Sequence, residues 1–173
     1  EKITFEVSSE ADADSIAGLY RAYYPNLSWT RDYLHWQYYQ NPAGKARNWV
    51  ARCQGKIVAS YTAVPFEIFV RGEIRKGWRM QDLLTRPEYG GLGIYHTFSR
   101  IANEFLMTPE YPFNFTFPNE RSHNGFVKTG WKVVFRIPLR ILALNSHKAV
   151  SRNVKAVPVN SFDSQVDAIW KSY

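Results

Sequence analysis

The 173-residue sequence contains a single cysteine and has no apolar run near the roughly 20 residues that cross a bilayer. Cys53 therefore cannot form an intrachain disulfide, and the cysteine usage does not indicate an oxidising compartment. Residues 1–7 alternate polar and apolar side chains, which is typical of an edge strand and not of a signal peptide. These absences predict a cytoplasmic protein without a membrane segment.

Two common catalytic patterns are also missing. No set of His, Cys, Asp and Glu residues has the spacing of metal ligands. No Gly-x-Ser-x-Gly elbow of a serine hydrolase occurs either. We therefore expect no bound metal and no serine nucleophile of that kind.

Acidic residues are absent from one long stretch. Between Arg121 and Phe162 the chain has eight Lys or Arg residues and no Asp or Glu. Such a segment can bind nucleic acid, an anionic ligand or an acidic partner. Because the aromatic strand motif of RNA-binding sheets is missing, we favour a solvated basic face with a phosphate-bearing ligand nearby over a nucleic-acid interface.

The first half of the chain predicts a strand, two helices and an antiparallel meander. Apolar residues recur at helical spacing after Ser9, and a second helix can start at Thr30 and stop before Asn41-Pro42. From residue 48 the period changes to two. Strands are expected over residues 49–53, 56–70 and 74–85, joined by turns at Gln54-Gly55 and Arg71-Gly72.

The second half predicts a helix from residue 94, a short strand at 113–117, a helix at 122–128 and a strand at 131–142. This order is α+β, with a central mixed, mostly antiparallel sheet flanked by helices. Residues 145–158 have few bulky apolar side chains. We therefore expect one domain at residues 1–142 and a linker within 143–173.

The most informative segment is a glycine-rich turn between a strand and a helix, Tyr89-Gly90-Gly91-Leu92-Gly93. Glycines allow close backbone approach and positive φ, and a helix start presents unpaired N–H groups beside its positive dipole end. Together these features can bind a pyrophosphate. The segment is neither a dinucleotide fingerprint, since residue 96 is His, nor a Walker loop.

Two separated blocks resemble the signatures of the GNAT N-acetyltransferase superfamily. Residues 87–95 lie over Pro-x-x-Arg/Gln-x-x-Gly-x-Gly/Ala, and residues 119–131 lie over Asn-x-x-Ala/Ser-x-x-x-Tyr-x-Lys-x-Gly-Phe. Residues 36–44 are similar to a branch of larger bacterial GNAT proteins, and residues 162–170 to the opening of a second lobe in that branch. The resemblance implies a GNAT-like acyl-CoA N-acyltransferase fold and a chain that is a fragment of a longer protein.

By the resemblance, the co-substrate is acetyl-CoA or another acyl-CoA, and the acceptor is the amine of a small molecule. The strand before the turn would pair with the pantetheine arm, the turn would bind the pyrophosphate, and the second block would hold the far side of the arm. The implied cofactor-binding residues are Leu83, Leu84, Thr85, Gly90, Gly91, Leu92, Gly93, Ile94, Tyr95, Asn119 and Phe126.

An amine acceptor must be neutral to attack a thioester, so the reaction needs a base. Asp82, on the strand that leads to the turn, is our first choice, although a structural carboxylate bonded to Arg79 explains it equally well. Strand parity leaves open whether Gln81 or Asp82 faces the substrate. His123 and Glu120, beside the second block, are the other candidates.

Three departures from the family pattern leave a second interpretation open. Gly90 stands where the family has Arg or Gln, Tyr95 replaces a small residue near the pyrophosphate, and Phe126 replaces a Tyr that protonates the leaving thiolate. The chain is then either an active acyltransferase on a small amine or amino-sugar, or a degenerate lobe that serves as scaffold or regulator of a second lobe.

Overall fold

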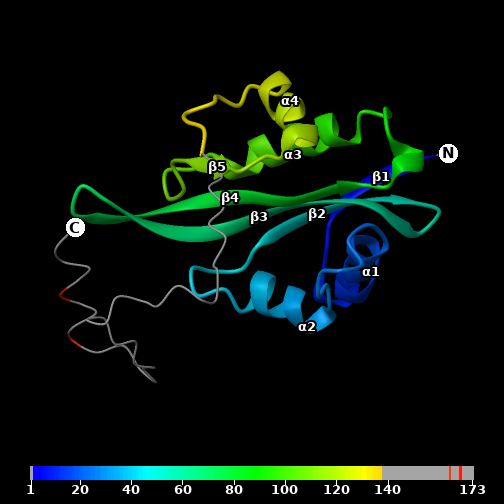
Figure 1. The fold of residues 1–173 in the computed structure, drawn as a ribbon, viewed down its shortest axis with the longest axis horizontal. Coiled ribbons are helices and arrows are strands. Elements are labelled where there is room, and N and C mark those ends of the chain that lie inside the picture. Colours follow the sequence, from blue (N-terminus) through cyan, green and yellow to red (C-terminus); the bar gives the residue numbers. More distant parts are fainter. Residues whose placement is uncertain (1, 138–163, 165–167, 169–173) are drawn as a thin grey trace, which may run out of the picture. The chain divides into compact units, whose positions relative to one another are not determined.

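The sheet of this protein is built from strands that pair in chain order (Figure 1). The computed structural model describes residues 2–137 together with residues 164 and 168. The five strands are β1 Ile3–Val7, β2 Arg47–Cys53, β3 Lys56–Val70, β4 Glu73–Thr85 and β5 Asn114–Thr116. Pairing is antiparallel from β1 to β4 and parallel between β4 and β5. The predicted mixed, mostly antiparallel sheet is confirmed.

The helices cover the two faces of the sheet in sequential pairs (Figure 1). The helical elements are Glu10–Asp12 (3₁₀), α1 Ala13–Tyr23, α2 Arg31–Leu34 continued by a π-type turn at His35–Tyr39, Pro87–Tyr89 (3₁₀), α3 Ile94–Leu106 and α4 Glu120–Lys128. Helices α1 and α2 lie on one face, and α3 and α4 lie on the other. None of the helices among the described residues has the length and apolarity that crossing a membrane requires.

Local signals that the sequence predicts are present at several element ends. Thr30 accepts a hydrogen bond from the Tyr33 N–H at 3.0 Å and so caps α2. The turns at residues 54–55 and 71–72 have positive φ at both residues, as the mirror-image hairpin turns require. Helix α4 begins two residues before the predicted start, because Asn119 caps it with its side chain.

Each face of the sheet has its own core. On the α3 side, Trp49, Tyr61 and Met80 pack with Phe98 and other buried residues. On the α1 side, Val50 and Val64 pack with α1 and α2 residues in a separate cluster. The alternation of side chains between these clusters explains why β2 and residues 57–65 of β3 are almost wholly buried.

The strand predicted at residues 131–142 is not found in its described part. Residues 131–137 are not in a strand, and Val133 and Val134 are 57% and 85% exposed. An alternating pattern forms a strand only where a neighbouring strand supplies hydrogen bonds, and none does so within residues 2–137. Residues 138–142, and all of the expected linker and second lobe except residues 164 and 168, lie outside the described residues.

Candidate functional site

The glycine-rich bend joins β4 to α3 with an open backbone. Gly91 and Gly93 have φ values of 76° and 71°, a region that residues with a Cβ rarely adopt. At both glycines the position of an added Cβ has no atom within 4 Å. The first hydrogen bond of α3 runs from the Thr97 N–H to the Gly93 carbonyl at 3.0 Å. The preceding N–H groups at the helix start have no intrahelical acceptor and can bind an anion.

Tyr95 lies in the first turn of α3 but its ring packs toward α4. Its hydroxyl is 3.1 Å from Thr129 Oγ1, and its ring stands 5.3 Å from that of Phe126. A Cβ at Gly125 would lie 3.0 Å from the Tyr95 ring, so the glycine makes room for it. The ring therefore packs between α3 and α4. This packing accommodates a tyrosine at a position where the family has a small residue.

A β-bulge interrupts β4 near its C-terminal end. Ser60 pairs with Leu84 and Thr62 with Gln81, so Asp82 and Leu83 together face a single residue of β3. Asp82 has a φ of 52°, in the left-handed region. The bulge rotates the Asp82 side chain onto the face that Gln81 occupies, and Gln81 Nε2 donates to Asp82 Oδ2 at 2.8 Å. Gln81 and Asp82 therefore lie on the same face of the sheet, so strand parity does not have to select one of them.

The Asp82 carboxyl ends a chain of buried hydrogen bonds. The Tyr38 hydroxyl donates to Asp82 Oδ2 at 2.7 Å, and Thr62 Oγ1 donates to the Tyr38 oxygen at 3.1 Å. Asn48 Nδ2 donates to Thr62 Oγ1 at 2.6 Å. The Tyr20 hydroxyl donates to the main-chain carbonyl of Asp82. Residues of α1, α2 and three strands thus fix the position of one carboxyl group.

The surroundings of Asp82 favour its protonated form more than water does. Burial raises the pKa of Asp82, and the hydrogen bonds from Tyr38 and Gln81 and the charge of Arg79 offset the shift only in part. Burial, followed by the charge of Asp82, raises the pKa of Tyr20 and Tyr38 well above the usual value for tyrosine. Tyr38 therefore remains a hydrogen-bond donor, and Asp82 is suited to accept a proton.

Strands β4 and β5 separate close to this carboxyl. They pair only from Trp78–Met80 to Asn114–Thr116, where Thr116 Oγ1 also donates to the Met80 carbonyl at 2.9 Å. β4 continues to Thr85, and within the described residues no strand pairs with residues 81–85 on the β5 side. Leu83, Leu84 and Thr85 lie in this open stretch, so an extended ligand can pair with it.

Asn119 and Phe126 occupy different settings on α4. Asn119 is exposed, and its Oδ1 accepts a hydrogen bond from the Ser122 N–H at 3.0 Å. That cap uses the oxygen and leaves the Nδ2 group as a donor for another partner. Phe126 is 4% exposed and packs among Tyr61, Tyr95 and Trp131. Its ring is part of the hydrophobic core on the α3 side of the sheet.

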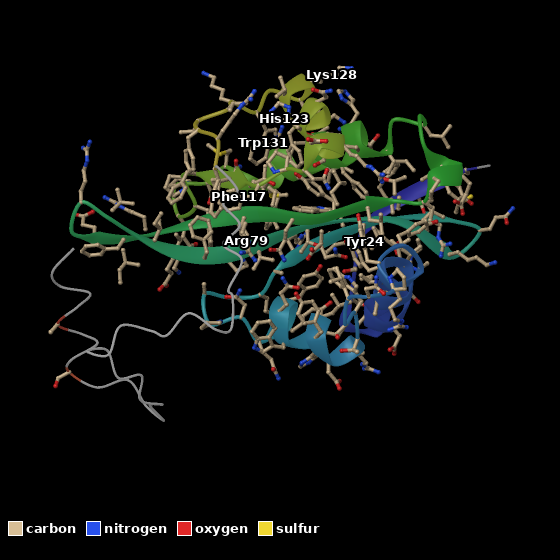
Figure 2. The ribbon with its side chains drawn as sticks, in the orientation of Figure 1. Tyr24, Arg79, Phe117, His123, Lys128 and Trp131 are labelled. Atoms are coloured by element: carbon tan, nitrogen blue, oxygen red, sulfur yellow. The ribbon has the colours of Figure 1, made fainter. Side chains whose placement is uncertain are left out.

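The three candidate bases do not come together. The Asp82 side chain lies on the α1 and α2 face with Tyr38, whereas Glu120 and His123 are on α4, across the sheet. Figure 2 shows His123 and Arg79 on opposite sides of the sheet. Glu120 is exposed and His123 is partly buried. Only Asp82 has hydrogen-bonding support from several elements.

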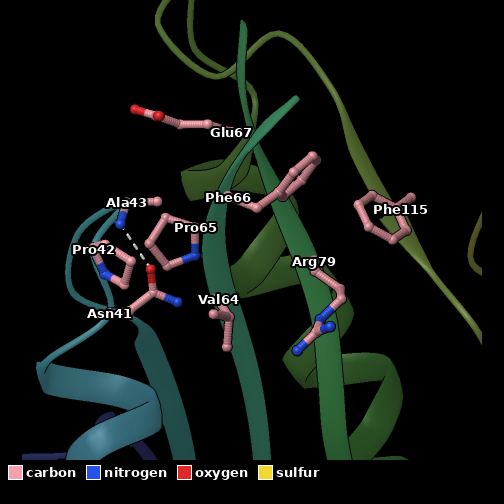
Figure 3. A pocket seen from close by; sticks show the side chains of 9 residues that line it. All are labelled: Asn41, Pro42, Ala43, Val64, Pro65, Phe66, Glu67, Arg79 and Phe115. Atoms are coloured by element: carbon pink, nitrogen blue, oxygen red, sulfur yellow. Dashed lines mark hydrogen bonds between the residues drawn. The ribbon is translucent and has the colours of Figure 1, made fainter. Parts of the chain in front are cut away.

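A hollow of about 380 Å³, lined in part by Arg79, opens on the α2 side of the sheet (Figure 3). Val64, Arg79 and Phe115 stand in register across β3, β4 and β5 at its floor. A second hollow of about 420 Å³ adjoins the glycine-rich bend. Its lining residues are Ile3, Glu88, Tyr89 and Leu92.

Sequence reasoning missed the groups that hold the carboxyl. Tyr38 follows α2 and is 1% exposed, and its hydroxyl binds Asp82. Of the groups around the carboxyl, the sequence pointed only to Arg79, as a possible partner of Asp82, and not to Tyr20 or Tyr38. No local pattern links these positions, because they meet through tertiary contacts 44 and 62 residues apart.

Comparison with known proteins gives a consistent result. A family model described as the acetyltransferase (GNAT) domain matches residues 8–134, whereas no curated protein matches. The fold is similar to aminoglycoside 6'-N-acetyltransferase AAC(6')-Ih from Acinetobacter baumannii (TM-score 0.64, 13% identity, 83% of this chain and 100% of that chain).

It is also similar to glucosamine-6-phosphate N-acetyltransferase from Arabidopsis thaliana (TM-score 0.65, 10% identity, 83% and 100% covered). A third similar structure is a predicted acetyltransferase from Clostridium acetobutylicum solved with acetyl-CoA (TM-score 0.60, 15% identity, 83% and 96% covered). These identities show a shared fold, and the family match covers most of the chain. The chain therefore belongs to the GNAT acetyltransferase family.

Proposed function

We propose that this chain is an N-acyltransferase that moves the acetyl group of acetyl-CoA, or the acyl group of a related acyl-CoA, to the primary amine of a small molecule. The observation that carries the proposal is the open stretch of β4, which has a buried carboxyl at one end and the exposed glycine bend at the other. A cytoplasmic location is part of the proposal.

The glycine bend fits a pyrophosphate. The amides of residues 91–95 can donate to it, and Gly91 and Gly93 leave the space above the bend free of side chains. Gly90 and Leu92 are also exposed within the bend, whereas Ile94 is buried and contributes only its backbone. The side chain that the family has at position 90 is absent, so binding rests on main-chain donors.

The pantetheine arm would follow β4 as an added strand. Leu83, Leu84 and Thr85 can offer main-chain groups along the side that β5 leaves open. The free Nδ2 donor of Asn119 would hold the far side of the arm, and Phe126 would support the site from below. A backbone N–H at the bulge would stabilise negative charge on the carbonyl oxygen.

Bound acyl-CoA supplies an activated thioester, and the chain supplies a base and a fixed geometry. The Asp82 carboxylate accepts one proton from the acceptor ammonium, and the freed nitrogen attacks the carbonyl carbon. The N–C bond forms and the C–S bond breaks, while a second proton moves from nitrogen to sulfur. The products are an N-acyl acceptor and a free thiol, and Asp82 returns its proton to water.

The alternative of a degenerate lobe that supports a second lobe is less well supported. It depended on Gly90, Tyr95 and Phe126, but the Tyr95 ring packs between α3 and α4. A proton path through the attacking nitrogen does not need a tyrosine at position 126. A nucleic-acid interface is the least favoured hypothesis, since the sequence lacks the aromatic strand motif of RNA-binding sheets.

Acetyl-CoA binding tests the proposal. Acetyl-CoA at about 100 times its Kd is expected to stabilise the fold by about 2.7 kcal/mol, which appears as a clear rise in Tm. Turnover is expected to release free thiol in the presence of a suitable amine. If millimolar acetyl-CoA leaves the Tm unchanged, the proposed function is wrong.

Substitutions of Asn119 separate helix capping from ligand binding. Asn119→Asp keeps the oxygen that accepts from Ser122 but removes the Nδ2 donor. It is expected to keep the Tm of the free protein while raising the Kd for acetyl-CoA by about 3- to 10-fold, the value of one hydrogen bond. Asn119→Ala is expected also to lower stability by about 1 kcal/mol, because the cap is lost. Equal acetyl-CoA affinities for Asn119→Asp and the parent protein would contradict the assigned contact.

A further inference from the structure

Arg79 is a partly buried cation without a close partner. Its side chain lines the 380 Å³ hollow on the α2 side of the sheet (Figure 3). Within residues 2–137 its guanidinium group makes no hydrogen bond and no ion pair, whereas Arg52 binds both Glu6 and Asp12. A guanidinium that is partly removed from water is usually paired, because each of its N–H donors otherwise loses a hydrogen bond. Arg79 is therefore available to an anionic ligand.

The remaining walls of the hollow are mainly apolar. Val64 and Phe115 flank Arg79 on the neighbouring strands. The Phe66 ring closes one end, where it packs against Phe115 at 4.7 Å between ring centroids. Gly77 permits this arrangement, since a Cβ there would lie 2.8 Å from the Phe66 ring. A volume of this size suits a small organic molecule with an apolar part and one anionic group.

Arg79 and Asp82 lie three positions apart on β4 and face the same side of the sheet. Both side chains lie on the α2 face of β4, separated by Met80 and Gln81. The positive charge of Arg79 lowers the pKa of Asp82 and opposes the larger effect of burial. Both charges also affect Tyr33 of α2. Burial and the charge of Asp82 raise the pKa of Tyr33, and the charge of Arg79 opposes this. The group proposed to receive the amine proton therefore lies on the same strand, and on the same face of the sheet, as the arginine that lines the hollow.

We propose that the acceptor is an amino acid with an apolar side chain, whose carboxylate binds Arg79 while its amine lies at Asp82. This inference rests on the proposed acyltransferase function and names its substrate class. A carboxylate fits better than a phosphate, because one guanidinium faces the hollow while Glu67 also lines it and Asp82 lies on the same face of the sheet. A dianion there would meet two acids with only one compensating cation.

Calorimetric titration with matched ligand pairs tests the inference without turnover. The pairs are L-leucine with 3-methylbutylamine and L-phenylalanine with 2-phenylethylamine. Each is titrated with and without millimolar CoA. At least one amino acid is expected to bind the parent protein about 10-fold more tightly than its partner without the carboxylate, as one charge-assisted contact provides. Arg79→Gln is expected to abolish this difference.

Two further variants make the result specific. Arg79→Lys keeps the charge but loses the planar fork, and is expected to retain only part of the preference. Arg75→Gln removes an exposed arginine of β4 that pairs with Glu73, and is expected to leave the preference intact. If the parent protein shows no preference in any pair, including through lack of binding, the inference is wrong. O-phosphoethanolamine binding better than the amino acids would also overturn it. Failure of the proposed function is seen separately, as a missing acetyl-CoA shift in Tm.

Discussion

Asp82→Asn is expected to lower kcat/KM for acyl transfer by about 10²- to 10⁴-fold, the usual contribution of a positioned general base. Asparagine has nearly the same shape as aspartate and can still accept the hydrogen bond from Tyr38, which is 2.7 Å long in the parent protein. It cannot take a proton from the ammonium group at neutral pH. Steady-state kinetics with saturating acetyl-CoA measure the loss.

The pH profile of the parent enzyme gives a second readout of Asp82. Burial raises the pKa of Asp82 from its ordinary value, and Tyr38, Tyr20, Tyr33 and Arg79 are the titratable groups that surround it. A base acts in its deprotonated form, so kcat/KM is expected to rise with pH through this raised pKa. Asp82→Asn is expected to lose that acid limb.

Stability provides the control for the Asp82 experiment. A carboxyl whose pKa is raised by folding contributes stability below its unfolded pKa, and that contribution is lost as pH rises through its folded pKa. Asp82→Asn is therefore expected not to lower the Tm at neutral pH, since it removes a buried charge. A variant with near-parental kcat/KM would show that Asp82 is only a structural carboxyl.

Gly91→Ala is expected to raise the Kd for acetyl-CoA by about 100-fold, which corresponds to the loss of one or two charge-assisted hydrogen bonds. The added Cβ occupies space that has no protein atom within 4 Å and that the pyrophosphate is proposed to fill. Alanine at a φ of 76° also strains the backbone by roughly 1–2 kcal/mol. Calorimetric titration with acetyl-CoA measures the change.

Gly55→Ala is the matched control for Gly91→Ala. Gly55 has the same φ of 76° and also has no atom within 4 Å of an added Cβ, but it lies in the β2–β3 hairpin turn. Both variants are expected to lose a similar amount of stability, and only Gly91→Ala is expected to lose acetyl-CoA affinity. A similar loss of affinity in both variants would mean that backbone strain, and not a blocked site, is responsible.

The fold was predictable because it depends on local patterns. The period of two in residues 49–85, with glycine turns between the strands, predicts the meander, and helical stripes predict α1 and α3. The strand expected at residues 131–142 failed in its described part because an alternating pattern does not specify a partner. The two segments that resemble the GNAT signatures, residues 87–95 and 119–131, also predict which elements precede and follow the bend.

The site was predictable only in part. The glycine bend and the importance of Asp82 follow from the sequence, since both lie on one short segment. The direction of the Asp82 side chain does not follow, because the bulge reverses the parity of β4 at that residue. The role of Tyr38 could not be predicted for another reason. The sequence does not distinguish a buried tyrosine that only packs from one whose hydroxyl also donates a hydrogen bond.

Titration of the ¹⁵N-labelled protein with acetyl-CoA, followed by amide NMR signals, tests the central claim most directly. Saturable shifts are expected for the amides of Gly91, Gly93 and Ile94 at the bend, together with those of Leu83 to Thr85 on the open side of β4. Amide signals in the β3–β4 turn at Arg71-Gly72 are expected to stay in place. If saturating acetyl-CoA leaves the bend unchanged, this protein does not bind its co-substrate in the way described above.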